Sequence, residues 1–355
     1  MSPDERMRQL ELRLTEFVQR ERTPGLQYVA VDARATLMSF AAGCAALRSR
    51  PMSMDTTLMA YSMSKTITAV AVLRLIEQRR LGIDDAIAKH LSWQPYGERV
   101  TVRQLLSHTG GLPNPIPLRW VHLPGEFDER AALRRVLQDH ARLATTPGTR
   151  FAYSNIGYWL LGALIEELSG VSFASYVQSQ VFAPLGLTSR DMAYTISDRT
   201  EQASGYLERF SALNLVRPLL LERRFTGERA GRWLEIRPHY VDGPAFGGIV
   251  GCARGFATFL QDQLCERSRV LGERARALLY EPQRTPRGEI PMTLGWHIGE
   301  FGGQRCYFKE GGGAGFHSLM RLYETKRIAT VLMTNATTFN VSRALDTLDT
   351  LLLSA

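Results

Sequence analysis

A serine and a lysine three residues apart open the most apolar helix that the sequence predicts. Ser62 and Lys65 precede an apolar run from Ile67 to Ile76, which stops at a charged stretch and Gly82. At this spacing the two side chains share one helical face, about one turn apart. We therefore expect the hydroxyl and the amine to lie together in the first turn of a buried helix. Free backbone N–H groups and the helix dipole favour a developing negative charge there.

The lysine is the more informative of the two residues. The chain contains 43 lysine and arginine residues, of which only Lys65, Lys89, Lys309 and Lys326 are lysine. An amine, unlike a guanidinium, can lose its proton near neutral pH when burial lowers its pKa. A neutral Lys65 could then accept the proton of Ser62. The motif alone arises often by chance, and it also fits a solvated lysine at an ordinary helix start.

Length and composition limit the possible classes of protein. A chain of 355 residues is long for one simple core, so we expect two lobes or one elaborated domain. The net charge is +8, but basic residues alternate with acidic ones, which argues against a nucleic-acid partner. No stretch resembles a membrane span or an export signal, so we expect a cytoplasmic protein without a membrane partner. The four scattered cysteines predict free thiols and no metal site.

The hydrophobic pattern predicts strands near both ends of the chain and helices between them. The predicted strands lie at 26–32, 35–42, 305–309, 315–323 and 327–335. The predicted helices lie at 4–21, 100–106, 127–144, 173–186 and 254–266, after Ser62, after Asn155 and at the end of the chain. We therefore expect an α/β (α+β) fold. Its central antiparallel sheet would be formed by the N- and C-terminal segments and flanked by helices, beside a mostly helical second lobe.

The same pattern predicts a discontinuous domain division. Residues 1–82 and 246–355 would form the sheet domain, and residues 83–245 the helical domain. The segment 196–244 has mixed charges and scattered glycine and proline, which predicts an irregular insertion over the site. The walls of a substrate pocket are expected from 114–126 and from this insertion.

A tyrosine and an asparagine form a second candidate cluster at the start of a predicted helix. Tyr153 and Asn155 follow a sharp turn at Pro147 and Gly148. A phenol near two ammonium groups would have a lowered pKa, which makes Tyr153 a candidate general base. An amide such as Asn155 could hold a substrate carbonyl. By itself the cluster also fits a packing tyrosine and a helix-start asparagine. His108, in a glycine-rich turn, is expected to be structural.

The third cluster is Lys309-Glu310-Gly311-Gly312-Gly313, at the end of a predicted strand. Glycines there allow a ligand to approach the backbone closely and leave an N–H group free to donate.

In this order, the three clusters resemble the motifs of the serine β-lactamase and penicillin-binding-protein superfamily. The Tyr-x-Asn form is similar to the branch that holds class C β-lactamases, D-peptidases and family VIII carboxylesterases. The resemblance covers residues 24–335 approximately, including the stretch Leu105 to Leu112 and the stretch Pro147 to Asn155.

The resemblance implies an acyl-enzyme mechanism without a cofactor or metal. Ser62 would attack a carbonyl carbon. Tyr153, together with Lys65, would act as the base and return the proton to the leaving group. Asn155 would position Lys65 and the substrate, and Lys309 would support the Tyr153 phenolate.

The resemblance also implies an oxyanion hole made by the backbone N–H groups of Ser62 and Gly312. Glu310, Gly311 and Gly313 would line the substrate site. The family usually has Thr or Ser at the position of Glu310, where the hydroxyl helps bind a substrate carboxylate. A carboxylate would repel such a group if it faces the pocket, although strand alternation could turn it away.

These observations favour a serine carboxylesterase acting on short-chain or uncharged esters, with a small-molecule ester or amide as the partner. The first alternative is hydrolysis of β-lactams or D-amino-acid peptides, which uses the same catalytic residues. Further alternatives are acyl transfer and a non-catalytic binding scaffold, and the presence of every motif residue disfavours the scaffold. The chain has no Gly-x-Ser-x-Gly, so an α/β-hydrolase is excluded. The oligomeric state is left open.

Overall fold

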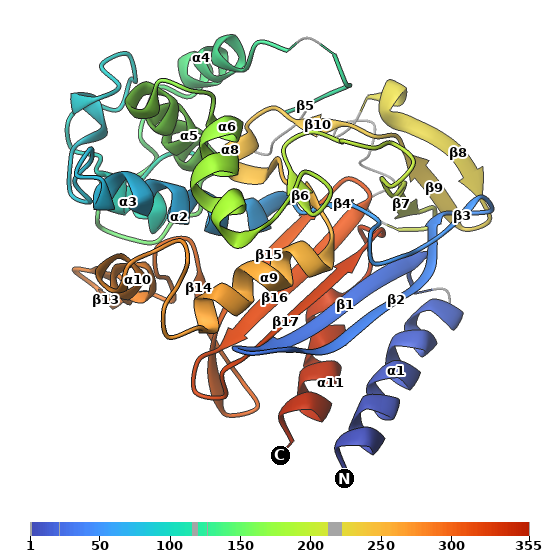
Figure 1. Cartoon of the computed structure of the whole chain (residues 1–355). Helices are drawn as coiled ribbons and strands as arrows, with labels where there is room; N and C mark the ends of the chain where they lie inside the picture. Colours follow the sequence, from blue (N-terminus) through green and yellow to red (C-terminus); the bar gives the residue numbers. More distant parts are fainter. Residues whose placement is uncertain (1, 21, 116–119, 126, 212–221, 355) are drawn as a thin grey trace.

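A seven-stranded antiparallel sheet forms the centre of the molecule, with strand order β14-β15-β16-β17-β1-β2-β3 (Figure 1). The computed structural model describes residues 2–20, 22–115, 120–125, 127–211 and 222–354. The strands of the sheet are β1 (Gly25–Asp32), β2 (Thr36–Ala46), β3 (Arg50–Pro51), β14 (His297–Phe301), β15 (Gln304–Gly313), β16 (Phe316–Tyr323) and β17 (Ile328–Thr334). The predicted fold class is confirmed, although β3 and β14 were not predicted.

The two ends of the chain meet in the middle of this sheet. β1 pairs with β17 from Leu26 opposite Thr334 to Asp32 opposite Ile328. All of β1 except its last residue is buried. A strand covered on both faces loses the apolar–polar alternation of a half-exposed strand, and this explains the nearly continuous apolar sequence of β1.

Each face of the sheet packs into its own apolar core, because alternate side chains of a strand point in opposite directions. Val29 and Val31 join the core that contains residues of α2 (Ser64–Glu77) and α9 (Ala253–Leu264). Tyr28 and Ala30 join the core formed with α1 (Pro3–Gln19) and α11 (Val341–Leu353). Figure 1 shows α1 and α11 together on one side of the sheet and α9 on the other.

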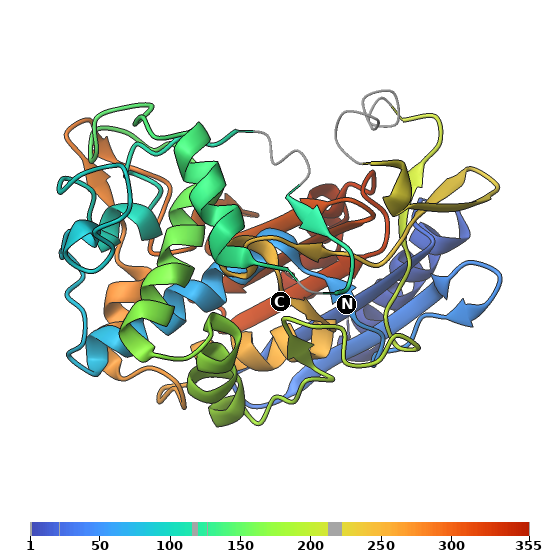
Figure 2. The same ribbon diagram turned by 90° about the horizontal axis from the view of Figure 1, so that it is seen from above.

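A helical region covers the α2 side of the sheet. Its helices are α3 (Val102–Leu106), α4 (Glu129–Asp139), α5 (Asn155–Ser169), α6 (Phe173–Val177) and α8 (Pro244–Gly247). A further helix, α10 (Glu273–Tyr280), lies nearby. Figure 2 shows the green helices of residues 129–169 on the opposite side of the view from the yellow strands of residues 226–236. One apolar core continues from the sheet into α2 and α5. The domain boundaries after 82 and 245 stay predictions.

The predicted irregular insertion at 196–244 contains a small sheet, so the prediction was wrong for this part. Its strands, in the order β7-β9-β8, are β7 (Gly205–Glu208), β8 (Thr226–Ala230) and β9 (Trp233–Ile236). They are only four or five residues long, and no residue of β8 is buried, so no apolar period marked them. Residues 116–119 and 126 of the predicted pocket wall, and 212–221 of the insertion, lie outside the described residues.

One short three-stranded sheet, in the order β4-β11-β6, and two strand pairs, β5 with β10 and β12 with β13, complete the described structure. Their strands are β4 (Leu58–Met59), β5 (Val121–His122), β6 (Met192–Ala193), β10 (Tyr240–Val241), β11 (Val250–Gly251), β12 (Arg284–Thr285) and β13 (Gly288–Glu289). The pair of β5 with β10 joins the two segments predicted to form the pocket walls.

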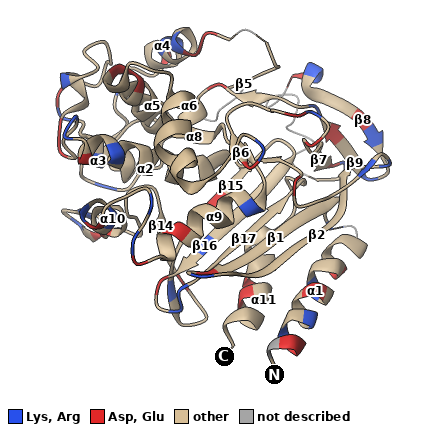
Figure 3. Ribbon diagram, viewed as in Figure 1, with Lys and Arg blue, Asp and Glu red and all other residues tan. Residues whose placement is uncertain are grey.

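Charged residues of both signs are spread over the helices and loops (Figure 3). Within the described chain, no single helix is both long and apolar enough to cross a bilayer. The stretch Asn155–Ser169 passes that test only jointly with Phe173–Leu185, and the two are bent by 77°.

Candidate active site

The predicted nucleophile lies one turn ahead of α2 rather than inside it. Ser62 is the middle residue of a 3₁₀ turn, Tyr61–Met63, while Lys65 belongs to the first turn of α2. Tyr61, directly before Ser62, has a positive φ of 45°, which is uncommon for a residue with a side chain. Nearly every residue of α2 is buried, and Lys65 is 0% exposed. The amine is therefore held in apolar surroundings beside the hydroxyl.

Four of the predicted catalytic residues, Ser62 included, form one hydrogen-bonded cluster. Ser62 Oγ lies 2.8 Å from Tyr153 Oη and 3.1 Å from Lys65 Nζ. Lys65 Nζ also donates to Asn155 Oδ1 at 2.8 Å and to the backbone carbonyl of Phe246 at 2.6 Å. The serine hydroxyl is thus placed between a phenol and an amine whose position is fixed by two further acceptors.

The partners of Lys65 leave room for a proton from Ser62. The oxygens of Asn155 and Phe246 are carbonyl oxygens that only accept hydrogen bonds. A neutral amine has two N–H bonds for these two acceptors, and its lone pair then remains for the hydroxyl of Ser62. Proton transfer from Ser62 to Lys65 would convert the amine into an ammonium with a third N–H bond.

Burial decides the protonation of the amine and the phenol. Burial, and then the charge of Lys309, lower the pKa of Lys65 well below that of a free lysine. Burial also raises the pKa of Tyr153, against the smaller opposing effect of its hydrogen bond with Ser62. The prediction that nearby ammonium groups lower the pKa of Tyr153 was wrong. The resting site therefore holds a protonated phenol beside an amine that is readily neutral.

Lys309 approaches Tyr153 from the sheet, as predicted. It is 1% exposed, and its Nζ lies 5.3 Å from the centre of the Tyr153 ring. Among the described residues its amine has no hydrogen-bond partner. Burial lowers the pKa of Lys309 to about 7. Its charge can therefore change in the neutral pH range, next to the group that contacts Ser62.

The glycines at the end of β15 let this strand touch the nucleophile turn. A Cβ on Gly311 would lie 2.0 Å from the carbonyl oxygen of Ala60, and one on Gly313 would lie 2.4 Å from the ring of Tyr61. Side chains at these positions would therefore push β15 away from the turn that carries Ser62. The oxyanion role of the backbone N–H groups of Ser62 and Gly312 stays a prediction.

We expect Gly311→Ala to impair both folding and hydrolysis, because its Cβ would meet rigid backbone at Ala60. Overpacking of this kind costs about 1–3 kcal/mol of the free energy of unfolding. Gly312→Ala is the matched control, since its Cβ would point to the other face and meet the side chain of His317 at 3.2 Å. Thermal unfolding and initial rates would be compared. Equal losses in the two variants would contradict the close approach at Gly311.

The Glu310 side chain is not brought to the site. In the sheet register, Glu310 lies opposite Leu319, whose side chain packs in the α1 and α11 core. The neighbouring Lys309 faces the other side of the sheet, opposite Met320. Glu310 Oε1 accepts a hydrogen bond from Nε2 of His317 at 2.5 Å. The prediction that Glu310 lines the substrate site is thus corrected for its side chain, which lies on the far face.

Sequence reasoning missed one contributor to the site and assigned a structural role to a second. The carbonyl of Phe246 has no signal in the sequence, because every residue carries such a group. His108 was assigned a structural role, and its ring lies 4.2 Å from that of Tyr153. Its Nδ1 accepts a hydrogen bond from the backbone N–H of Ser154 at 3.2 Å. His108 therefore acts as a packing support that sets the position of Tyr153.

A histidine of the insertion contacts the residue that precedes Ser62. His239 Nε2 lies 3.0 Å from the hydroxyl of Tyr61, which also donates to the carbonyl of Ala314 at 2.8 Å. The side chain that precedes Ser62 is thereby tied to the end of β15 and to the segment 196–244.

Comparison with known proteins shows which family the chain belongs to. The model of a family described as "Beta-lactamase" matches residues 10–355. Penicillin-binding protein 4* of Bacillus subtilis is 26% identical over 295 residues, which is 81% of this chain, and the chain spans 62% of that relative's length.

Two solved structures show a similar fold. D-amino acid amidase from Ochrobactrum anthropi SV3 gives a TM-score of 0.82 at 18% identity, covering 99% of both chains. EstCE1, described as a hydrolase with promiscuous acyltransferase activity, gives 0.74 at 19% identity, covering 98% of both chains. Because the family model covers nearly the whole sequence and the fold agrees, the chain belongs to the beta-lactamase family.

Proposed function

We propose that this protein is a serine hydrolase that forms an acyl-enzyme on Ser62, and that it acts as a carboxylesterase on short-chain or uncharged esters. One observation carries the hydrolase assignment. The Ser62 hydroxyl lies within hydrogen-bond distance of Tyr153 at 2.8 Å and of Lys65 at 3.1 Å. A nucleophile between a proton acceptor and a proton donor is what acyl transfer needs.

Acylation uses the two groups in opposite directions. Ser62 gives its proton to neutral Lys65 as its oxygen attacks the ester carbonyl carbon. Tyr153 gives its proton to the departing alkoxide, which leaves as an alcohol. The resulting phenolate lies near the ammonium of Lys65 and near Lys309, whose Nζ is 5.3 Å from the Tyr153 ring. Positive charge close to a phenolate stabilises it.

Deacylation reverses the two transfers. Water gives a proton to the Tyr153 phenolate while its oxygen attacks the acyl group. The Ser62 oxygen leaves and recovers the proton that Lys65 holds. Ester and water become acid and alcohol, and the enzyme returns to its starting state without a cofactor.

The charges around the site favour an uncharged substrate. Lys65 and Lys309 are almost fully buried, with exposed fractions of 0% and 1%. Burial, and then the charge of Lys309, lower the pKa of Lys65, His108 and His297, and within the described residues no arginine contributes to these shifts. Recognition of a carboxylate, such as that of a β-lactam, usually relies on an accessible cation or hydroxyl. Neither is supplied at position 310, whose side chain faces away.

Hydrolysis of a D-amino-acid amide or peptide is the second candidate. The similarity to D-amino acid amidase over 99% of both chains favours it. An amide has a poorer leaving group than an ester, so it depends more strongly on the proton of Tyr153.

A substrate comparison tests the proposal. Purified protein and its Ser62→Ala variant would be assayed with p-nitrophenyl butyrate, nitrocefin and D-phenylalanine amide. We expect Ser62-dependent turnover, with kcat/KM for the ester above that for the other two. A higher kcat/KM for nitrocefin or for the amide would overturn the esterase assignment. Ester turnover that persists in Ser62→Ala would overturn the hydrolase assignment itself.

A further inference from the structure

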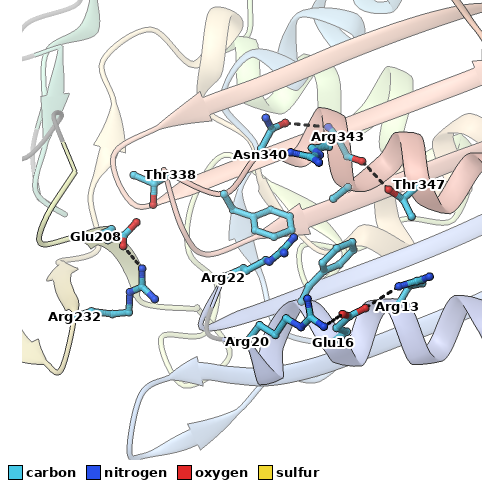
Figure 4. A pocket seen from close by; sticks show the side chains of 13 residues that line it. Arg13, Glu16, Arg20, Arg22, Glu208, Arg232, Thr338, Asn340, Arg343 and Thr347 are labelled. Carbon is cyan, nitrogen blue, oxygen red and sulfur yellow. Dashed lines mark hydrogen bonds and ion pairs between the residues drawn. The ribbon is translucent and has the colours of Figure 1, made fainter.

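A cavity of about 410 Å³ lies between the end of α1, the start of α11 and the small sheet of β7, β8 and β9 (Figure 4), and Ser62 is not among its lining residues. Its lining residues are Arg13, Glu16, Phe17, Arg20, Arg22, Glu208, Arg232, Thr338, Phe339, Asn340, Arg343, Ala344 and Thr347. We call it the arginine pocket. It lies beside the helices that cover one face of the sheet, whereas Lys65 belongs to the core on the other face.

The arginine pocket concentrates positive charge. Five of its thirteen lining residues are arginine, and two are glutamate. In the whole chain 39 of 355 residues are arginine, so the pocket holds more than three times the average share. Three of the five positive charges are left without a matching negative charge in the lining. Such a surplus in a concave site attracts anions, because low-dielectric walls focus the field.

The ion pairs show which guanidinium groups remain available. Glu16 is shared by Arg13 at 3.0 Å and Arg20 at 2.6 Å. Glu208 pairs with Arg232. In the described part of the chain, no carboxylate pairs with Arg22 or Arg343.

Arg22 and Arg343 approach the cavity from different elements. Figure 4 shows Arg343 on α11 and Arg22 between α11 and the ion pairs of α1. The guanidinium of Arg22 is close enough to Glu16 to contribute to the lowered pKa of that carboxyl, together with Arg13 and Arg20. Arg22 and Arg343 both line the cavity, so their positive charges act on the same space.

The backbone of α11 adds to the same field. Asn340 is the N-cap of this 13-residue helix, and its side chain accepts from the N–H of Arg343 at 2.9 Å. The positive end of the helix dipole thus points toward the cavity. Phe17 and Phe339, whose ring centres are 5.6 Å apart in an edge-to-face arrangement, supply an apolar part of the lining.

We propose that the arginine pocket binds a small molecule carrying a phosphomonoester or polyphosphate group, at a site separate from Ser62. Guanidinium groups match phosphate oxygens with paired hydrogen bonds, and Arg22 and Arg343 are the two that such a ligand would engage. The cavity volume suits a small ligand rather than a macromolecule.

Isothermal titration calorimetry with pyrophosphate, at constant ionic strength, tests the proposal. We expect the wild-type protein to bind pyrophosphate at a single site. The Arg22→Ala/Arg343→Ala variant should bind more weakly by about a hundredfold or more, since two charge-assisted contacts are lost. Arg287→Ala, which removes an exposed arginine from the turn between β12 and β13, is the charge control and should bind nearly as the wild type does.

Three results with the wild type and the two control variants would overturn the proposal. They are absence of pyrophosphate binding by the wild type, equal weakening in Arg287→Ala, and loss of binding in Ser62→Ala, which would place the anion in the active site. Arg22→Gln serves as a milder second variant if the double variant unfolds, and undiminished binding by it would also overturn the proposal.

Sedimentation with phosphatidic acid vesicles, compared with phosphatidylcholine vesicles, identifies the source of the phosphate. Arginine-dependent sedimentation supports a lipid headgroup, and pyrophosphate binding without sedimentation supports a soluble ligand.

Discussion

Lys65→Met is expected to lower kcat/KM for ester hydrolysis by about 10²- to 10⁴-fold, the range that a general base contributes. Methionine retains the length and apolar body of the side chain but cannot accept the proton of Ser62. The fold should persist, because removing a buried amine also removes the cost of burying it. Circular dichroism and thermal unfolding would verify this. A rate near that of the wild type would show that Lys65 is not the base.

Lys65→Arg separates the basicity of this side chain from its positive charge. A guanidinium stays protonated at all ordinary pH values, so this variant should be as slow as Lys65→Met.

In the wild type, kcat/KM should fall as the pH is lowered through the pKa of Lys65, because protonation removes the lone pair. Burial places that fall well below pH 10.5. Substantial activity in Lys65→Arg would contradict the role of the neutral amine.

Tyr153→Phe has the second large expected effect, and that effect should depend on the leaving group. The substitution keeps the ring that packs against His108 and faces both lysines, and it removes only the hydroxyl near Ser62. For an alkyl ester, we expect kcat/KM to fall about 10²- to 10³-fold, because the alkoxide needs the proton of Tyr153. For a p-nitrophenyl ester the loss should be smaller, since p-nitrophenolate leaves without a proton.

The comparison of the two esters separates two roles of the phenol. If Tyr153 were the base that deprotonates Ser62, its loss would slow both esters equally. The ratio of kcat/KM values for ethyl butyrate and p-nitrophenyl butyrate, in wild type and Tyr153→Phe, is therefore the measurement. An unchanged ratio would contradict the assignment of Tyr153 as the acid of acylation.

The sequence predicted the parts of the site in which reactive residue types occur at a spacing that brings them together. Ser62 and Lys65 are one helical turn apart, so their proximity follows from local geometry alone. The central sheet also followed from local patterns, because β1, β16 and β17 have strong apolar runs. The meeting of Tyr153 and Lys309 with Ser62 depends on long-range packing, and it was reached through the family resemblance rather than from spacing.

Other features depend on quantities that a sequence does not contain. The pKa of Tyr153 is governed by its burial, which outweighs the charges that the sequence suggested. The direction of Glu310 depends on the register of β15 with β16, since a shift of one residue would turn the side chain to the other face. The arginine pocket combines elements from residues 13 to 347 and has no local motif.

Detection of the acyl-enzyme would show whether Ser62 is the nucleophile. Protein mixed briefly with p-nitrophenyl butyrate would be quenched in acid, digested with trypsin and examined by mass spectrometry. We predict one added butyryl group on the peptide 49–65, assigned by fragmentation to Ser62 and absent in Ser62→Ala. Three results would contradict covalent catalysis by Ser62. They are an adduct on the nearby Ser64, an adduct elsewhere, and ester turnover through Ser62 with no covalent adduct.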